Sequence, residues 1–341
     1  MKKQIKVGNV IIGNPNHIPI QSMTNTKTKN IDETVSLIKR LTDAGCEIIR
    51  VAVVDLEDAQ AIKEIKKLIS IPIVADIHYD YRLAIASIEA GADKIRINPG
   101  NIPQTEDLYK VIDKAEEYNI PIRIGFNSGS IDDITSNKHK LDELEKTISK
   151  YVKLFEERDF TNLCISVKMT DPLLTIEANR LCNKLFNYPL HIGLTEAGNH
   201  ISGTIRSSYV LGTLLAEGIG DTIRVSLTAD PVKEIEVAKE ILKIHGLYKG
   251  ITLISCPTCG RCNYDMMKIV DEMYPHIMKI GKELTVAIMG CSVNGPGEAK
   301  DADLGIAGGK NEALLFKKGK PIRKIPQDQI ITELLNEINE Y

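Results

Sequence analysis

The chain has 341 residues, of which 43% are hydrophobic and 26% are charged, and this balance is typical of a protein that folds around its own core. Its formal net charge of -3 argues against a nucleic-acid or membrane-surface binder, because such proteins are usually basic. No run of about 18 apolar residues occurs, and the apolar stretch near the N-terminus is too short for a signal peptide, so we expect a cytoplasmic protein.

The first 245 residues alternate short apolar segments of strand-like composition with amphipathic, helix-like segments. Repeated strand–helix units imply parallel strands with helical crossovers, and eight units favour a closed (β/α)8 TIM barrel over an open sheet. The first helix-like segment, 31–45, should begin at an aspartate cap and end at Gly45. A long polar segment after the fifth strand, 128–140, is a candidate for a mobile flap. The expected strands are 18–24, 47–53, 71–78, 93–100, 120–127, 161–168, 188–196 and 221–228.

The character of the chain changes after about residue 245, where a small α+β domain is expected to begin. The apolar runs 251–255 and 284–290 read as strands, and each ends at a cysteine segment. Helices are expected over 264–281 and 330–341, with further strands or a hairpin over 303–325. The predicted domains are therefore 1–245, a barrel, and 246–341, a cysteine-bearing domain.

Polar residues gather at the C-terminal ends of the expected strands, where the active sites of TIM barrels lie. Several are two residues apart within one strand, as Arg96 and Asn98 are, and a period of two places such pairs on one face. The dipeptide Ile-Arg also recurs at equivalent strand positions. The residues expected at the barrel mouth are Arg50, Asp76, His78, Arg96, Asn98, Arg123, Asn127, Lys168, Glu196, Arg224 and Ser226.

Five of these residues are cations, and the two carboxylates Asp76 and Glu196 cannot balance them. An unpaired buried cation is costly, so five that converge need an anion, unless they point outward or pair with helix carboxylates. A phosphorylated or diphosphorylated small molecule is the natural guest, because guanidinium groups bind such oxygens in pairs. His78, two residues after Asp76, reads as a positioned acid/base or as a structural histidine.

The seven cysteines fall into two classes. Cys46, Cys164 and Cys182 lie singly in apolar settings and are expected to be small buried hydrophobes, with no disulfide framework. The other four follow the spacing Cys-x-x-Cys-x-x-Cys with one distant partner, which favours an iron–sulfur site over a zinc site or no metal. By spacing alone the ligands are Cys256, Cys259, Cys262 and Cys291.

The chain resembles the family of bacterial 4-hydroxy-3-methylbut-2-enyl diphosphate synthases along its whole length. The motifs that carry the resemblance are IQSMTNT, ADIH, KIRINPGN, IRIGFNSGS, SVKMTD, LHIGLTEAG, DTIRVSLTADP, SCPTCGR and MGCSVNGPGEA. The resemblance implies a TIM barrel joined to a [4Fe–4S] domain, without the extra middle domain of some relatives. It also implies two-electron reduction of 2-C-methyl-D-erythritol 2,4-cyclodiphosphate with ring opening and loss of water, with ferredoxin or flavodoxin as donor. A homodimer in which the cluster domain of one subunit caps the other's barrel is implied as well.

Residue roles carried over from the family differ from the spacing argument at one point. The family's cluster ligands match Cys256, Cys259, Cys291 and Glu298. Cys262 lies outside these positions, as a bystander or as a thiol that substitutes when Glu298 leaves. The acid/base candidates match Asp76, His78 and Glu196, with Glu196 the first choice. The diphosphate-binding positions match Arg50, Arg96, Asn98, Arg123, Asn127, Lys168, Arg224 and Ser226.

Two rival interpretations belong to other functional classes. One is a non-enzymatic redox or iron sensor whose barrel binds a phosphorylated effector. The other is a zinc-stapled barrel enzyme that acts on a pterin or a phosphosugar. Iron and sulfide content separates the second from an iron–sulfur enzyme, and turnover of the cyclodiphosphate separates the first.

Overall fold

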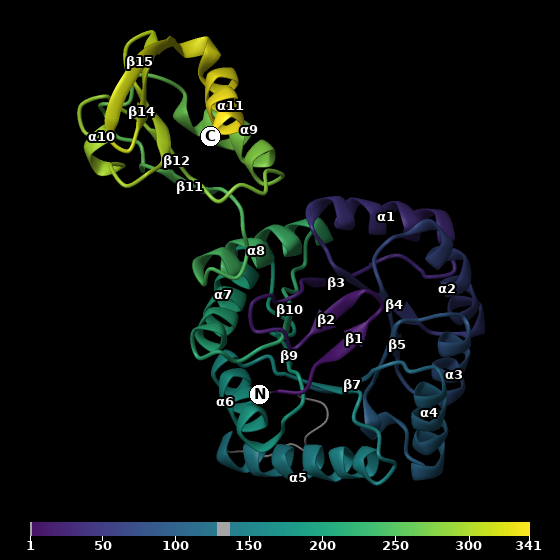
Figure 1. Cartoon of the computed structure of the whole chain (residues 1–341). Helices are drawn as coiled ribbons and strands as arrows, with labels where there is room; N and C mark the ends of the chain where they lie inside the picture. The colour runs from purple at the N-terminus through teal and green to yellow at the C-terminus, as the bar shows by residue number, and fades with distance from the viewer. Residues whose placement is uncertain (1, 128–136) are drawn as a thin grey trace. The chain divides into compact units, whose positions relative to one another are not determined.

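A computed structural model describes residues 2–127 and 137–341. The chain divides into two compact units, Met1–Leu247 and Tyr248–Tyr341 (Figure 1). Within the described ranges, no helix has the length and apolar character needed to cross a membrane.

The first unit is the predicted TIM barrel. Its first six barrel strands form one parallel sheet in chain order, and the last two pair with each other in parallel. Isolated parallel bridges from Ile165 to Leu190 and from Ile20 to Ile223 close the ring. The strands are β3 (Gln21–Met23), β4 (Ile48–Val53), β5 (Ile73–Ile77), β6 (Lys94–Ile97), β7 (Ile122–Asn127), β8 (Leu163–Lys168), β9 (His191–Gly193) and β10 (Thr222–Arg224).

A helix follows each barrel strand, and in Figure 1 these helices ring the strands. Their buried faces are apolar, which is why the amphipathic segments pack outside the sheet. The helices are α1 (Ile31–Ala44), α2 (Leu56–Leu68), α3 (Tyr81–Glu89), α4 (Thr105–Glu117), α5 (Asn137–Glu156), α6 (Pro172–Leu185), α7 (His200–Ala216) and α8 (Pro231–Ile244), with a 3-10 turn at Pro99–Asn101.

The ends of the helices show where local sequence rules succeeded and failed. Gly45 ends α1 in the left-handed conformation (φ 104°), as predicted. The predicted aspartate cap of α1 is wrong, because Asn30 occupies the cap position and makes no side-chain cap hydrogen bond. Asp171 does cap α6, where its carboxylate accepts from the Leu174 N–H.

The structure describes only part of the candidate flap, 128–140. Residues 128–136 lie outside the described residues. The remaining part of the prediction, 137–140, is wrong, because these residues already belong to α5.

A hairpin that the sequence did not reveal covers the N-terminal end of the barrel. It consists of β1 (Ile5–Val7) and β2 (Val10–Ile12), which turn at Gly8 with φ 57° (Figure 1). Val7 and Ile12 pack in one apolar cluster with Ile48, Val74 and Cys164 from the barrel strands. The hairpin therefore seals the barrel end opposite the one where strand-end side chains gather.

The single cysteines behave as predicted. Cys46, Cys164 and Cys182 are all buried as free thiols. Burial raises the pKa of Cys46 and of Cys182 to about 12, so both stay protonated at neutral pH. The Cys46 thiol also donates to the Ile48 carbonyl over 3.1 Å.

The second unit is the expected small α+β domain. Its sheet has the order β11-β12-β13-β14-β15, with three parallel strands followed by an antiparallel pair. An apolar core between the sheet and helices α9 and α11 holds it together. The elements are β11 (Thr252–Ser255), α9 (Met266–Ile277), β12 (Thr285–Met289), α10 (Gly295–Glu298), β13 (Leu304–Gly308), β14 (Glu312–Lys317), β15 (Lys320–Pro326), a 3-10 turn at Gln327–Gln329 and α11 (Ile330–Glu340).

The hairpin predicts a matched pair of stability effects at neighbouring residues. Ile12 is fully buried where the hairpin covers the N-terminal end of the barrel, whereas Ile11 is 47% exposed. Ile12→Ala should lower the free energy of unfolding by about 2–5 kcal/mol, because it leaves a cavity. Ile11→Ala should change it by less than about 0.5 kcal/mol. Equal effects of the two substitutions in urea unfolding would contradict the packing of the hairpin.

Candidate functional site

Five cationic side chains converge inside the C-terminal end of the barrel. Arg123 is fully buried, and the side chains of Arg50, Arg96 and Arg224 are only 14%, 14% and 16% exposed. Burial lowers the pKa of Lys168 well below its usual range, and the four arginines lower it further. This mutual repulsion means that the five charges share one space.

One buried carboxylate lies among these cations. Asp76 Oδ1 accepts a hydrogen bond of 3.1 Å from Arg96 Nη1, and Asp76 Oδ2 lies 3.7 Å from Arg50 Nε. Burial acts to raise the pKa of Asp76, but Arg50, Arg96 and Arg123 outweigh it, and the pKa falls below its usual value. Asp76 is therefore ionised at neutral pH and holds two guanidinium groups in place.

The remaining two arginines are less well compensated. Arg123 Nη1 donates to Gln21 Oε1 over 3.5 Å, and burial followed by repulsion from Arg96 lowers its pKa to about 10. Arg224 Nη2 lies 3.6 Å from Glu234 Oε1 of α8. Arg224 therefore has a helix carboxylate nearby, which was the alternative to an anionic ligand, but the contact is long. Among the described residues, the Nε atoms of Arg123 and Arg224 have no hydrogen-bond partner.

A buried histidine supports Lys168. Lys168 Nζ lies 3.1 Å from His191 Nε2, and His191 is fully buried. Burial, and then the charge of Lys168, lower the pKa of His191 well below its usual value. The imidazole is therefore neutral, and a hydrogen bond joins its Nε2 to the lysine nitrogen. Nδ1 has no partner in the part of the chain that the structure describes.

Sequence reasoning missed a sixth cation, Lys94. Its ammonium is fully buried and finds no hydrogen-bond partner within residues 2–127 and 137–341. Burial lowers its pKa to about 7. Lys94 is two residues before Arg96 on β6, so the period-two argument that found Arg96 contained the signal for Lys94 as well.

Met23 was also missed, and it lies between two of the arginines. Its thioether sulfur accepts from Arg50 Nη2 over 2.9 Å and lies 3.8 Å from Arg224 Nη1. A thioether is only a weak acceptor and carries no charge. The contact orients the guanidinium groups without neutralising them.

Two strand glycines leave room for these side chains. A Cβ at Gly125 would lie 2.8 Å from Arg96 Nε, and one at Gly193 would lie 2.7 Å from Lys168 Nζ. A Cβ at Gly193 would also lie 2.5 Å from the Arg224 backbone oxygen, so glycine is required there, whereas at Gly125 a side chain would displace the Arg96 guanidinium. The glycines thus shape the floor of the site.

The predicted acid Glu196 lies at the rim of the mouth. It is exposed, its backbone is left-handed (φ 53°), and its Oε2 accepts a hydrogen bond of 2.9 Å from Thr170 Oγ1. A left-handed conformation in a residue other than glycine costs free energy and is most common at functional sites. The carboxylate is fixed by its neighbour and open to a ligand.

The other predicted mouth residues follow the strand ends. Asn98 is buried, and its Oδ1 accepts from the Gly100 N–H over 3.2 Å. His78 is exposed, and its ring lies 5.9 Å from that of Tyr79. Asn127, the last residue of β7, is exposed, and Ser226, just after β10, is half-buried.

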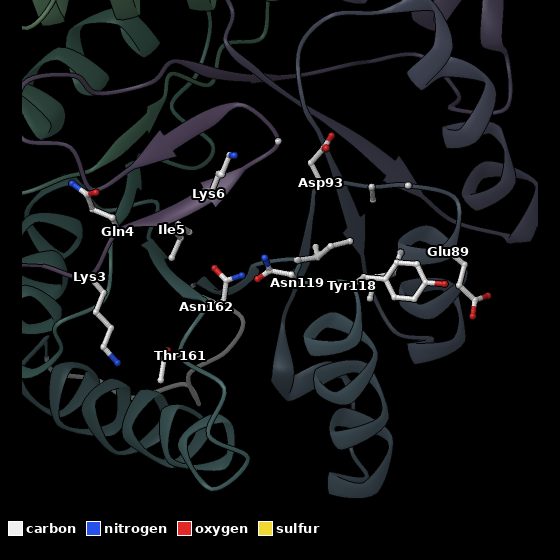
Figure 2. A pocket seen from close by; sticks show the side chains of 15 residues that line it. Lys3, Gln4, Ile5, Lys6, Glu89, Asp93, Tyr118, Asn119, Thr161 and Asn162 are labelled. Atoms are coloured by element: carbon white, nitrogen blue, oxygen red, sulfur yellow. The ribbon is translucent and has the colours of Figure 1, made fainter.

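A separate hollow lies at the other end of the barrel. It has a volume of about 780 Å³ and lies between the hairpin and the strand starts, where Lys6, Asp93, Tyr118 and Asn162 line it (Figure 2). None of the five mouth cations contributes to its wall. It is therefore not part of the cationic site.

In the second unit, two cysteine loops leave the same edge of the sheet. β11 and β12 are parallel neighbours, with Ser255 opposite Ile288, so Cys256 and Gly290 emerge side by side. The Gly290 N–H donates to Cys256 Sγ over 3.1 Å. A Cβ at Gly290 would lie 3.3 Å from Cys256 Sγ and 3.2 Å from Cys262 Sγ, so the two sulfurs border one small space.

The other predicted ligands are arranged more loosely. The backbone N–H groups of Asn294 and Val293 and the side chain of Arg261 stabilise the thiolate of Cys291, and its pKa falls below the usual value. Cys259 and Glu298 are exposed. Within the described ranges, no three histidine, cysteine or acidic side chains lie close enough together to hold a metal ion.

The donors at these loops nevertheless have the chemistry of an iron–sulfur site. They are thiols, the ligands that soft iron prefers, and a backbone amide already donates to one sulfur. Cys256 and Cys262 also pack against the apolar core of the unit. Amide donors and an apolar surround are what tune the potential of a bound cluster. The residues present therefore fit the group.

Comparisons with known proteins find relatives of both units of the chain. The chain matches the family models described as GcpE TIM-barrel domain, over residues 2–239, and GcpE protein C-terminal domain, over residues 252–340. A protein of Caldicellulosiruptor saccharolyticus named 4-hydroxy-3-methylbut-2-en-1-yl diphosphate synthase (flavodoxin) is 55% identical, over 99% of this chain and 98% of its own. Proteins of the same name from Ruminiclostridium cellulolyticum and Geobacillus thermodenitrificans are 52% and 50% identical, over 99% of this chain and 97% and 91% of theirs.

Solved structures show the likeness of the barrel alone. Dihydropteroate synthase from Stenotrophomonas maltophilia superposes with a TM-score of 0.52 at 13% identity, over 70% of this chain and 97% of its own. The Yersinia pestis dihydropteroate synthase gives a TM-score of 0.51 at 12% identity, over 72% of this chain and 98% of its own. At such identities the match concerns the fold and not the chemistry.

Lys94 predicts a pH-dependent difference in stability. Between pH about 7 and its ordinary pKa of 10.5, the unfolded chain holds the Lys94 proton and the folded chain does not. The free energy of unfolding therefore rises with pH across this window in the wild type, by at most about 1.4 kcal/mol per pH unit.

Lys94→Met removes this dependence while keeping the side-chain volume. It should be more stable than the wild type near pH 7, and the gap should narrow as pH rises toward 10. The exposed Lys63→Met serves as control, with a constant difference. If urea unfolding gave the same difference in free energy between Lys94→Met and the wild type at every pH, the Lys94 ammonium of the wild type would be compensated.

Proposed function

The chain belongs to the GcpE family, whose full-length relatives are 4-hydroxy-3-methylbut-2-en-1-yl diphosphate synthases, and from this premise we propose how its residues perform the reaction. The enzyme is an oxidoreductase of the methylerythritol phosphate pathway, with flavodoxin as electron donor. It converts 2-C-methyl-D-erythritol 2,4-cyclodiphosphate to 4-hydroxy-3-methylbut-2-enyl diphosphate, opening the ring and releasing water at the cost of two electrons.

The observation that carries the proposal is the excess of buried positive charge at the barrel mouth. Arg50, Arg96, Arg123, Lys168 and Arg224 meet there, and among the described residues the buried carboxylates near them are Asp76 and Glu234. A diphosphate supplies the missing negative charge and enough oxygens for paired guanidinium contacts. We place the diphosphate in this cluster of cations, with Asn98, Asn127 and Ser226 as further polar contacts.

Binding of the substrate changes the protonation of Lys168 at the barrel mouth. Burial and repulsion lower the pKa of Lys168 when the site holds no anion. A bound diphosphate reverses the repulsion and raises that pKa, so the ammonium is fully charged when it is needed. Lys168 then donates to the phosphate, with the neutral His191 fixing its position from behind.

The cysteine loops are the proposed binding site of a [4Fe–4S] cluster, with Cys256, Cys259, Cys291 and Glu298 as its ligands. When bound there, the cluster supplies the two electrons one at a time. The chain's own contribution is to hold the thiolates: the Gly290 N–H donates to Cys256, and Arg261 stabilises Cys291.

Of the three acid/base candidates, Glu196 is best placed to move a proton. It is open to a ligand at the rim and oriented by the Thr170 hydroxyl. In this proposal Glu196 holds the proton that leaves with the substrate hydroxyl as water. Asp76 is engaged by Arg50 and Arg96, so its role is to position them. His78 is exposed near the same rim and is a second proton carrier.

Each unit holds only one of the two groups of side chains that the reaction requires. The barrel carries the cations, and the second unit carries the thiols. We therefore propose a homodimer in the cytoplasm in which the cluster unit of one subunit caps the barrel of the other. Ferredoxin is an alternative donor to flavodoxin.

The first test of this function is turnover with a matched pair of arginine variants. Anaerobically reconstituted enzyme with reduced flavodoxin should convert the cyclodiphosphate. Arg123→Met should lower kcat/KM by roughly 10–150-fold, the value of a lost charged hydrogen bond of about 1.5–3 kcal/mol. Arg82→Met, on the exposed end of α3, should leave it unchanged. An iron-loaded protein without turnover would favour the sensor interpretation instead.

Glu196 offers an independent prediction about the proton. Glu196→Gln keeps the shape of the side chain but removes the acid, so kcat should fall about 10²–10⁴-fold while KM stays nearly constant. Iron content should equal that of the wild type. The exposed Glu64→Gln is the control. A normal kcat for Glu196→Gln would contradict the role of Glu196 as proton donor and would favour His78 instead.

A further inference from the structure

Cys262 is the thiol for which the proposed function has no use, yet it lies where a ligand would. It is half-buried and packs against the same apolar core as Cys256, whereas Cys259 is exposed. Its N–H donates to the Cys259 carbonyl over 2.9 Å, which folds the loop back on itself. The fold turns Cys262 inward and leaves Cys259 outward.

Three contacts bind this loop to the loop that carries Cys291. The Gly290 N–H donates to Cys256 Sγ, and Cys262 Sγ borders the same methyl-sized space above Gly290. Arg261, adjacent to Cys262, reaches the thiol of Cys291. Cys262 Sγ itself donates to the Tyr264 carbonyl over 3.3 Å, which keeps its position fixed. The thiol is thus held next to Cys256 and next to the backbone that leads into Cys291.

The carboxylate that the proposed function assigns to the fourth ligand position is held far less firmly. Glu298 is exposed at the end of the four-residue helix α10. A carboxylate is also a poorer ligand for iron than a thiolate. A half-buried thiol therefore lies beside a site whose assigned fourth ligand is exposed and chemically weaker.

We propose that Cys262 is a reserve ligand of the cluster, which binds iron when the carboxylate of Glu298 is withdrawn. In this exchange an iron–carboxylate bond breaks and an iron–thiolate bond forms. The thiol proton passes to the freed carboxylate or to water, and no electron is transferred. The consequence is retention of iron when the carboxylate is absent. This inference rests on the proposed function, because it requires a cluster at these loops.

The test compares iron retention in four variants of the full-length chain after anaerobic reconstitution. Against a competing chelator, Glu298→Ala should hold iron roughly 10–100-fold more tightly than Glu298→Ala/Cys262→Ser, the range typical when a group that supports a metal is lost. Cys262→Ser alone should keep its iron, because Glu298 remains. Glu298→Ala/Cys182→Ala, which removes a thiol of α6 in the barrel, should behave like Glu298→Ala.

A second readout does not depend on metal affinity. In iron-loaded Glu298→Ala, Cys262 should be protected from iodoacetamide, and in the cluster-free chain it should be modified, as peptide mass spectrometry would show. Equal iron loss from Glu298→Ala and the double variant, or full modification of Cys262 in the iron-loaded Glu298→Ala chain, would overturn the inference alone. A wild-type chain that takes up no iron and sulfide would overturn the cluster assignment itself, and the inference with it.

Discussion

The structure depends on one constraint: the cations buried at the barrel mouth are only partly compensated by the residues 2–127 and 137–341 that the structure describes. Asp76 engages Arg50 and Arg96, and Glu234 lies near Arg224. The Nε atoms of Arg123 and Arg224 remain without hydrogen-bond partners among the described residues. Keeping such groups out of water lowers the stability of the free protein. A bound anion offsets that cost, and a diphosphate offers both the charge and the oxygens for paired guanidinium contacts.

The second unit solves a different problem with different chemistry. Its two cysteine loops leave adjacent parallel strands, so the register of β11 and β12 brings the backbone that leads into Cys291 against Cys256. The Gly290 amide and the inward turn of Cys262 then define a small thiol-lined space. Charge selects the substrate in the barrel, whereas ligand softness selects the metal here. The converging cations lie in the first unit and the paired cysteine loops lie in the second, which is why the proposed reaction needs both.

Much of this could be predicted from the sequence because it follows from periodicity. The eight strands and the inward parity of Arg96 and Arg224 follow from a period of two. The hairpin of β1 and β2 escaped, because three-residue strands are too short for a pattern and their burial is set by distant partners such as Val74. Lys94 was overlooked although it shares the period-two parity of Arg96, whereas His191 escaped because a buried histidine has no local signature. The inward turn of Cys262 depends on loop geometry that spacing cannot specify.

The most direct test of the account is calorimetric titration of the cyclodiphosphate into the cluster-free chain near pH 8, in buffers of different ionisation enthalpy. Burial and the four arginines lower the pKa of Lys168 well below its usual range, so an arriving anion favours its protonated form. The account predicts binding with net proton uptake. Binding without proton uptake, or no binding, would contradict the claim that uncompensated cations at the barrel mouth are built for a diphosphate.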